Sequence, residues 1–466
     1  MLNTWKFVDS PTASPTVLLD MNDGATWKTL GGDFFKLPSP PLRRSLAQNN
    51  MTDGGILTSA AYDLRTLTFT VDLLGSTDTA RIAQLDALKA QLAKPSNLIM
   101  HQLQTASYPV FFRTLRSDDY VVDTEISANF WRVSCNVLAE PFAIGIRHDI
   151  TAGVVITNDP ASGTNKTFFD ITGVRGDSPA PAFVRVALGS GTAPTFFWAQ
   201  RTAGSPTALT VFAQAEAGTL GTDTTVQAND TQMSGSGSNF VRTTFATASL
   251  TTRLTVTAPT ASDVTALRGR YRVLVKIRMS ASGSNFTLRY LQNPSGTSPT
   301  PGQQISLDSS AAITTVDLGV VEFPGPGAMP STIGFSGLAA TYPTQSLAIQ
   351  IARNSGTSTL DMDYVYLLPA DERSAQFRRS NWASSSYLCI DGPQEMAYGM
   401  ASGTTAFGAT RTVDNAGGLT SYFGGFPMLV PGVTNRWYAL IGPQPATAVS
   451  TWDVSYWPRW REVATS

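Results

Sequence analysis

Residues 64–74 read LRTLTFTVDLL, and this stretch decides the fold class of the N-terminal part of the chain. Leu67, Phe69 and Val71 alternate with polar residues, and β-branched threonines stand between them. An alternation with period two places apolar side chains on one face of a strand and polar side chains on the other. We therefore predict a half-buried β-strand.

An amphipathic helix is predicted directly after this strand, within STDTARIAQLDALKAQLAKPSN (residues 76–97). Thr77 or Asp78 can cap its start, and Pro95 ends it. Spacings of three, three and four place four apolar residues on one helical face. These residues are Ile82, Leu85, Leu88 and Leu92.

Three further strands are predicted after the helix, in residues 108–115, 120–126 and 130–142. No other segment has a convincing helical pattern, so the remaining cores must form from sheets packed on sheets. The predicted fold class is mainly β. We assign residues 1–147 to an N-terminal domain made of a sheet and one helix.

A change of composition marks a separate module in residues 213–372, which are rich in Thr, Ser and Gly and contain none of the nine tryptophans. The module is predicted to open with the strand QAEAGTL and to close with LDMDYVYLLPADE. Regularly spaced strands predict a β-sandwich or jelly roll. The flanking residues 148–212 and 373–466 share a density of apolar residues and tryptophans that the module lacks, which predicts one sandwich interrupted by another.

The charge pattern excludes several functions. The chain has 33 basic and 34 acidic residues among 466, without a long run of one sign. We therefore expect no sequence-specific binding of nucleic acid. No apolar stretch approaches the roughly 18 residues of a membrane span, and the N-terminus lacks the pattern of a signal peptide. We expect no membrane insertion and no export signal.

Catalytic and soft-metal motifs are missing from the sequence. Cys135 and Cys389 lie far apart, and His101 and His148 do not complete a metal site with them. We expect both cysteines to be buried. No motif of a serine hydrolase, a P-loop or a zinc protease is present, so we predict that the protein is not an enzyme. RGDSP at 175–179 favours a turn over an adhesion motif.

Three carboxylates are candidates for a site in the module. Asp361 and Asp363 lie on one face of a predicted strand, and Glu216 could join them. Three interpretations stay open: a glycosidase carboxylate pair, a structural calcium site, or side chains without a ligand. No other cofactor is indicated.

Tyrosine rings are the candidates for sugar binding, because they bring a large rigid surface to a sheet face or a loop. The module contains Tyr271, Tyr290 and Tyr342, and it lacks tryptophan. Core packing is the alternative role of each tyrosine.

The order of these elements resembles the distal tail protein of long, non-contractile-tailed bacteriophages, a minor tail or baseplate hub protein. The resemblance rests on the early strand and helix, the sheet that ends in Glu140, Pro141 and Phe142, and the terminal stretches GGFPMLVPGVTNRW and WDVSYWPRW. It covers roughly residues 1–210 and 376–466. The inserted module is similar in style to carbohydrate-binding jelly rolls.

The resemblance implies a virion protein at the distal end of the tail, made in the host cytoplasm. Its N-terminal domain is expected to form a ring of six copies, and its second, galectin-like sandwich is expected to project from that ring. The expected partners are the tail tube protein, a tail-tip hub or fibre protein and, for the inserted module, host cell-wall glycan.

Two terminal stretches and one arm receive an interpretation from this resemblance. Pro431 and Gly432 would shape a turn before a strand that begins near Asn435, and VSYWPRW (454–460) would be a terminal edge strand. Open sheet edges in the N-terminal domain would be paired in a cyclic assembly. An arm at residues 32–44 would contact the next subunit or fold back on its own domain. Its candidate anchors are Phe34, Phe35 and Leu37.

We thus predict a structural protein of the phage tail tip. A secreted or surface glycan-binding protein is the alternative, and a glycoside hydrolase is the third hypothesis.

Overall fold

The computed structural model is mainly β, as predicted, with one α-helix among the residues that it describes. The chain forms two compact units. The first unit comprises Met1–Asp149, Val174–Ala180 and Ser455–Ser466, and the second comprises Ile150–Gly173 and Pro181–Val454. The described residues are 4–30, 38–48, 55–102, 109–127, 130–157, 168–189, 195–203, 212–228, 230, 233, 239–246, 248–257, 269–295, 299–308, 313–323, 346–370, 374–379, 386–401, 420–442 and 449–461.

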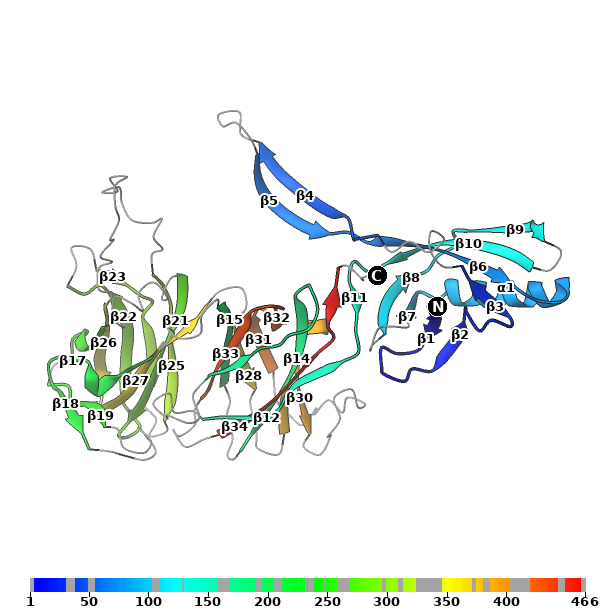
Figure 1. The fold of residues 1–466 in the computed structure, drawn as a ribbon. Helices are drawn as coiled ribbons and strands as arrows, with labels where there is room; N and C mark the ends of the chain where they lie inside the picture. Colours follow the sequence, from blue (N-terminus) through cyan, green and yellow to red (C-terminus); the bar gives the residue numbers. More distant parts are fainter. Residues whose placement is uncertain are drawn as a thin grey trace. The chain divides into compact units, whose positions relative to one another are not determined.

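The first unit contains a ten-stranded sheet with the order β2-β1-β7-β8-β10-β6-β3, in which β9 pairs with β10 and β11 pairs with β8 and β35 (Figure 1). A hairpin of β4 and β5 forms a separate two-stranded sheet. The strands are β1 Thr4–Val8, β2 Val17–Asp20, β3 Trp27–Thr29, β4 Leu42–Gln48, β5 Gly55–Tyr62, β6 Arg65–Leu73, β7 Ser96–Gln102, β8 Val110–Leu115, β9 Tyr120–Ser127, β10 Phe130–Ala139, β11 Ala143–Ile144 and β35 Arg459–Trp460.

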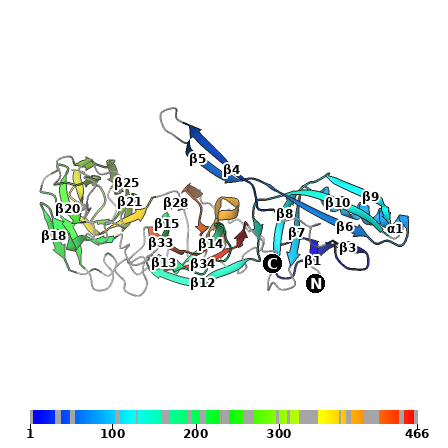
Figure 2. The ribbon, with the colours of Figure 1, turned by 45° about the horizontal axis from the view of Figure 1, so that its top comes forward.

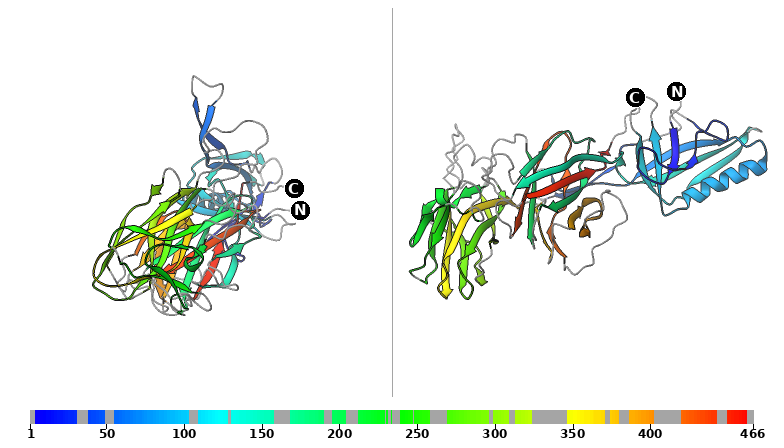
Figure 3. Two further views of the ribbon diagram at one scale, coloured as in Figure 1. Left: turned by 90° about the vertical axis from the view of Figure 1, so that its left-hand side faces the viewer. Right: turned by 90° about the horizontal axis from the view of Figure 1, so that it is seen from below.

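Helix α1 (Asp78–Leu92) follows β6 and lies alongside the sheet (Figure 3). The Thr77 hydroxyl caps it by accepting a hydrogen bond from the Ala80 amide at 3.2 Å. Leu85, Leu88 and Leu92 are buried in one core with Leu67, Phe69 and Val71 of β6, as both patterns predicted.

The predicted face of α1 was wrong at one position. Ile82 is 48% exposed, and Arg81 is buried in its place. The Arg81 guanidinium donates to the Gly75 carbonyl at 2.8 Å and pairs with Asp78, also at 2.8 Å. These bonds satisfy the buried charge, which periodicity alone does not reveal.

The second unit contains an outer pair of sheets built from strands on both sides of the inserted residues. Their orders are β12-β34-β14-β29-β30, with β32 on β14, and β13-β33-β15-β28-β31. The strands are β12 His148–Thr157, β13 Phe168–Ile171, β14 Ala180–Leu188, β15 Thr195–Ala203, β28 Ser374–Arg379, β29 Ser386–Asp391, β30 Met396–Ala401, β31 Thr420–Gly424, β32 Met428–Leu429, β33 Thr434–Gly442 and β34 Val449–Tyr456, with a short 3-10 helix η4 at Gly392–Gln394.

The turn before β33 matches its prediction. Gly432 has a φ of 75°, a conformation that glycine adopts without strain. Asn435 holds the turn closed, because its side chain accepts from the Val430 amide and donates to the Val430 carbonyl, each at 2.9 Å.

The interpretation of VSYWPRW as an edge strand was wrong. Strand β34 ends at Tyr456 and lies between β12 and β14, inside its sheet. Pro458 follows the end of that strand, where its missing donor costs no ladder bond. The next two residues, Arg459 and Trp460, form β35 in the sheet of the first unit.

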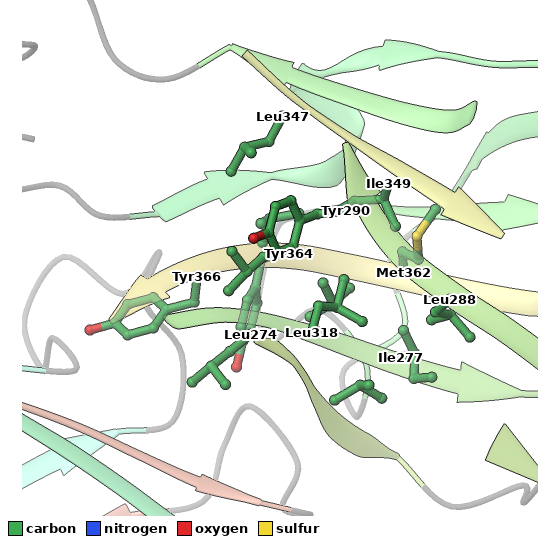
Figure 4. Close-up of a cluster of buried hydrophobic side chains, with 14 of the residues drawn as sticks. Leu274, Ile277, Leu288, Tyr290, Leu318, Leu347, Ile349, Met362, Tyr364 and Tyr366 are labelled. Atoms are coloured by element: carbon green, nitrogen blue, oxygen red, sulfur yellow. The ribbon is translucent and has the colours of Figure 1, made fainter. Parts of the chain in front are cut away.

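Residues 212–369 supply two further sheets (Figure 2). The first middle sheet has the order β18-β19-β27-β21-β25, with β16 on β27, and the second middle sheet has the order β17-β20-β26-β22-β23, with β24 on β22. Buried side chains such as Leu274, Leu288 and Tyr364 fill the space between the two sheets (Figure 4). The strands are β16 Phe212–Gln214, β17 Thr219–Leu220, β18 Thr224–Gln227, β19 Phe240–Thr243, β20 Thr251–Thr257, β21 Gly269–Met279, β22 Asn285–Gln292, β23 Thr300–Pro301, β24 Ile305–Asp308, β25 Thr314–Phe323, β26 Ser346–Ser355 and β27 Leu360–Pro369.

The stretch QAEAGTL is not the single opening strand that was predicted. Strand β16 ends at Gln214, and Ala215–Ala217 form a 3-10 helix, η3. The Gly218 amide closes η3 by donating to the Ala215 carbonyl at 3.1 Å. The predicted closing strand is β27.

Strands β15 and β28 form an antiparallel pair in which Ala199 lies opposite Ser374. Residues 212–369 therefore stand in the chain as the connection between two neighbouring strands. The domain boundaries at 147, 212 and 372 stay a prediction.

The one α-helix in the described part of the chain does not have the length and apolar character of a membrane span.

Candidate functional site

The aspartates proposed as calcium ligands or catalysts lie on β27, and both are buried. Asp361 receives two guanidinium groups: Arg242 lies 2.7 Å from one carboxylate oxygen, and Arg278 lies 3.0 Å from the other. Arg278 also pairs with Asp230. The charge of Asp361 is therefore neutralised by side chains of β19 and β21.

Asp363 is paired in a similar way with a lysine of β21. The Lys276 ammonium lies 3.1 Å from a carboxylate oxygen of Asp363 and donates to the Met233 carbonyl oxygen. It also lies 5.5 Å from the centre of the Tyr364 ring. A side-chain cation thus lies beside Asp363, where a structural calcium ion was one of the three interpretations.

Glu216 lies in η3 and is half-buried. Burial raises the pKa of its carboxyl above the ordinary value, and hydrogen bonds from the backbone of Glu216 and Asn239 oppose this shift. Within the described residues, no group of three or more His, Cys, Asp or Glu side chains could hold a metal ion. Asp361 and Asp363 are held in ion pairs, so these two are not a free carboxylate couple of the kind that glycoside hydrolysis uses.

The predicted sugar-binding role is wrong for the two candidate tyrosines that the structure describes. Tyr271 is fully buried in β21, and Tyr290 is 7% exposed in β22. The Tyr290 hydroxyl donates to the Val320 carbonyl at 2.8 Å, and the chain at Gly302 covers one part of its ring. Neither ring offers a face to a sugar, because apolar core side chains surround both. Tyr342 lies outside the described residues.

The predicted interface anchors Phe34, Phe35 and Leu37 also lie outside the described residues. Other apolar side chains reach solvent on the edges of the ten-stranded sheet. Val17 and Leu18 on β2 are 44% and 43% exposed, and Val121 on β9 is 66% exposed. Among the described strands, β2 pairs with β1 alone and β9 pairs with β10 alone, so each presents an edge.

The RGDSP segment is held against the C-terminal segment within the first unit. The Asp177 amide donates to the Arg459 carbonyl at 2.9 Å, and the Asp177 carboxylate accepts from the Arg461 amide at 2.7 Å. The Arg65 guanidinium donates to the Arg461 carbonyl at 3.0 Å. The bonds of Asp177 give the RGDSP segment a structural role, because they hold residues 459–461 in place.

The cysteines are buried free thiols, as predicted. Burial raises the pKa of the Cys135 thiol to about 12, which keeps it protonated at neutral pH. His101 is buried and stacks on Trp5 with ring centres 3.8 Å apart. His148 packs edge-on against Tyr456. These surroundings explain the four residues as parts of the fold.

Sequence reasoning missed a set of polar side chains on the outer face of the second middle sheet. They alternate with core residues along β22 and β26, and period-two alternation could have found them. They bond to one another across strands, at Thr252, Asn285, Thr287, Arg289, Ser306, Asp308, Gln350 and Asn354.

No protein-family model matches the chain, and no curated protein matches its sequence. Among solved structures, the chain is similar to the SPP1 Dit (gp 19.1) protein, described as a paradigm of the hub adsorption apparatus in phages infecting Gram-positive hosts. This likeness has 8% identity and a TM-score of 0.37 over 98% of this chain and 99% of that chain. Two structures of the activated phage p2 baseplate, with Ca and with Sr, each show 11% identity and a TM-score of 0.26 over 43% of this chain and 72% of that chain.

Proposed function

We propose that the chain is a structural protein of a bacteriophage tail tip, in which several copies form a closed ring between the tail tube and the tail-tip hub or fibre proteins. The proposal is supported by the order of sequence elements that resembles distal tail proteins. A ring of six copies is the form that this resemblance implies.

The observation that carries the proposal is the pair of apolar edges on the ten-stranded sheet. Val17 and Leu18 project from the edge strand β2, and Val121 projects from β9. Exposed apolar edge strands associate with further strands unless a partner covers them. The two edges differ in sequence, so one copy offers two different surfaces. Head-to-tail contacts between different surfaces close into a ring when the rotation permits.

Electron microscopy and light scattering of the purified full chain test this proposal. We expect rings for the wild type and smaller species for Leu18→Lys and for Val121→Lys, because a lysine on an edge strand opposes pairing. Val226→Lys is the matched control, since Val226 is 43% exposed on β18 in the second unit. A monomer at every concentration, or rings that tolerate both edge substitutions, would contradict the proposal.

A glycan-binding role of the inserted module is a second candidate function, alone or as part of the tail tip. It is favoured by the jelly-roll strand order that we infer for the two middle sheets, β19-β27-β21-β25 facing β20-β26-β22-β24. Hydrolysis is disfavoured, because Asp361 and Asp363 are committed to buried ion pairs.

A further inference from the structure

Strand β27 of the first middle sheet is covered on both faces. Tyr364 and Tyr366 belong to the core between the middle sheets, and the alternating residues Val365 and Leu367 are buried as well. The same hydrophobic cluster includes residues from β15 and β33 of the outer pair of sheets. A ligand therefore has no open face along β27.

The second middle sheet differs, because one face of its central strands reaches solvent. Phe286 and Leu288 of β22 are buried, whereas Thr287 and Arg289, which alternate with them along the strand, are half-buried. On β26, Ile349 and Ile351 are buried in the core. The alternating residues of that strand face away from the core.

A ladder of hydrogen bonds crosses this open face. The Arg289 guanidinium donates to the Gln350 side-chain carbonyl at 2.7 Å, and the Gln350 amide donates to the Thr252 hydroxyl at 3.4 Å. The Asn354 amide donates to Asn285 at 2.6 Å and to Thr287 at 2.8 Å. The two groups of bonds bring together side chains of β20, β22 and β26.

The ladder continues to the next strand and combines both charge signs. The Asn285 amide donates to Asp308 at 3.0 Å and to Ser306 at 3.2 Å on β24. Between the polar side chains, Ala348 and Ala352 of β26 are buried. The accessible part of this face is therefore formed by the polar side chains, which are held in place by their mutual bonds.

We infer that this face binds a neutral saccharide chain through pairs of adjacent hydroxyl groups. Amide, guanidinium and carboxylate groups each offer two polar atoms in one plane, and hydroxyl groups can both donate to them and accept from them. Arg289 and Asp308 carry opposite charges, which disfavours a strongly charged polymer. The mutual bonds hold the side chains before a ligand arrives, which lowers the entropy cost of binding.

This inference names a site for the proposed glycan-binding role of the inserted module, and it rests on that proposed role. None of the eight ladder residues is aromatic, so the ladder itself provides no ring for stacking on a sugar, and we expect weak affinity per copy. A ring would multiply weak sites into useful avidity.

The test uses the full chain on a microarray of bacterial capsular and cell-wall polysaccharides. We expect the wild type to bind at least one polysaccharide, and Gln350→Ala and Asn354→Ala to lower the apparent affinity by about tenfold each through lost hydrogen bonds. Gln227→Ala, a matched change on β18, should bind like the wild type. Thermal unfolding of each variant verifies folding.

Two results would overturn the inference: no polysaccharide retained by the wild type, or equal binding by all variants. Electron microscopy of the same preparations separates this inference from the proposed ring. Intact rings without binding by the wild type reject the saccharide face alone. Binding by a monomer that loses affinity in Gln350→Ala supports the face and rejects the ring.

Discussion

The Lys276 ammonium lies 3.1 Å from the Asp363 carboxylate, and both side chains are removed from water. Lys276 also donates to the Met233 carbonyl oxygen. A buried lysine needs such oxygen partners, because an unpaired charge in the interior is costly. The second unit therefore supplies its own cation beside β27.

Replacing only the lysine should be strongly destabilising. We expect Lys276→Met to lower the free energy of unfolding by about 3–5 kcal/mol, because Asp363 would remain as an unpaired buried charge. The double variant Lys276→Met/Asp363→Leu should recover most of this loss. Urea unfolding of the full chain measures both. Equal losses in the single and double variants would show that the ion pair is not the cause.

Calcium should have no effect on thermal stability. Asp361 and Asp363 already face side-chain cations, so neither offers an uncompensated charge to a metal ion. We expect the same Tm in millimolar calcium chloride and in EDTA. An ion that binds only the folded state raises Tm with its concentration, so such a rise would restore the calcium hypothesis.

The sequence was most informative where one periodicity decided the structure. Period-two alternation predicted the core face of β6, but it did not predict that Thr70 and Asp72 on the opposite face are buried as well. The same pattern in β21 and β27 did not reveal that both faces of β27 are covered, since this depends on strands distant in sequence. Sugar binding and core packing were both open roles for Tyr271, and its position in the core favours packing.

Long-range pairing limited the prediction of the C-terminus in the same way. The composition of VSYWPRW is that of a strand near an edge, and Pro458 does break a strand. Only the partner strand β11 shows that Arg459 and Trp460 join the sheet of the first unit. The candidate carboxylate site was the hardest part to predict from the sequence, because the burial of Asp361 depends on arginines from β19 and β21.

Neutralising Glu216 should stabilise the protein at neutral pH. Burial raises the pKa of this carboxyl in the folded state above its unfolded value, so its contribution is favourable at low pH and is lost as pH rises through the folded pKa. We expect Glu216→Gln to raise Tm at about pH 7 and to leave it nearly unchanged at about pH 4, near the unfolded pKa. A variant less stable than the wild type at neutral pH would contradict this reasoning.

Gly176 in the RGDSP segment should not tolerate a side chain. Its φ is 108°, and an added Cβ would lie 2.5 Å from the Arg459 carbonyl oxygen. We expect Gly176→Ala to lower the free energy of unfolding by about 1–3 kcal/mol. Gly173→Ala is the control, because Gly173 also has a positive φ of 68° but has open space around its Cβ position. Equal effects would assign the cost to φ alone.

Removing the inserted module tests the predicted domain organisation. Ala199 lies opposite Ser374 in the β15–β28 pair, so a short Gly-Ser linker in place of residues 213–372 can connect the two strands. Insertions between neighbouring strands are tolerated in this way. We expect the remainder to fold once its newly exposed apolar surface is made polar, as judged by a cooperative thermal transition and a β-type circular dichroism spectrum.

The same deletion should also expose an apolar surface on the outer pair of sheets. Phe197 of β15 and Leu440 of β33 share a buried hydrophobic cluster with side chains of the inserted module. On β15, the flanking Phe196 contacts Trp452 instead, with ring centres 5.3 Å apart. We therefore expect the deletion variant to aggregate, and Phe197→Ser/Leu440→Ser to restore its solubility. In the full chain, the same two changes should lower the free energy of unfolding, by about 2–5 kcal/mol for each large side chain lost from the cluster.

Light scattering measures the aggregation of the deletion variant, and urea unfolding measures the stability of the full chain. A deletion variant that fails to fold even with both serines would show that the outer sheets require the module, and that the two sandwiches are not separate domains.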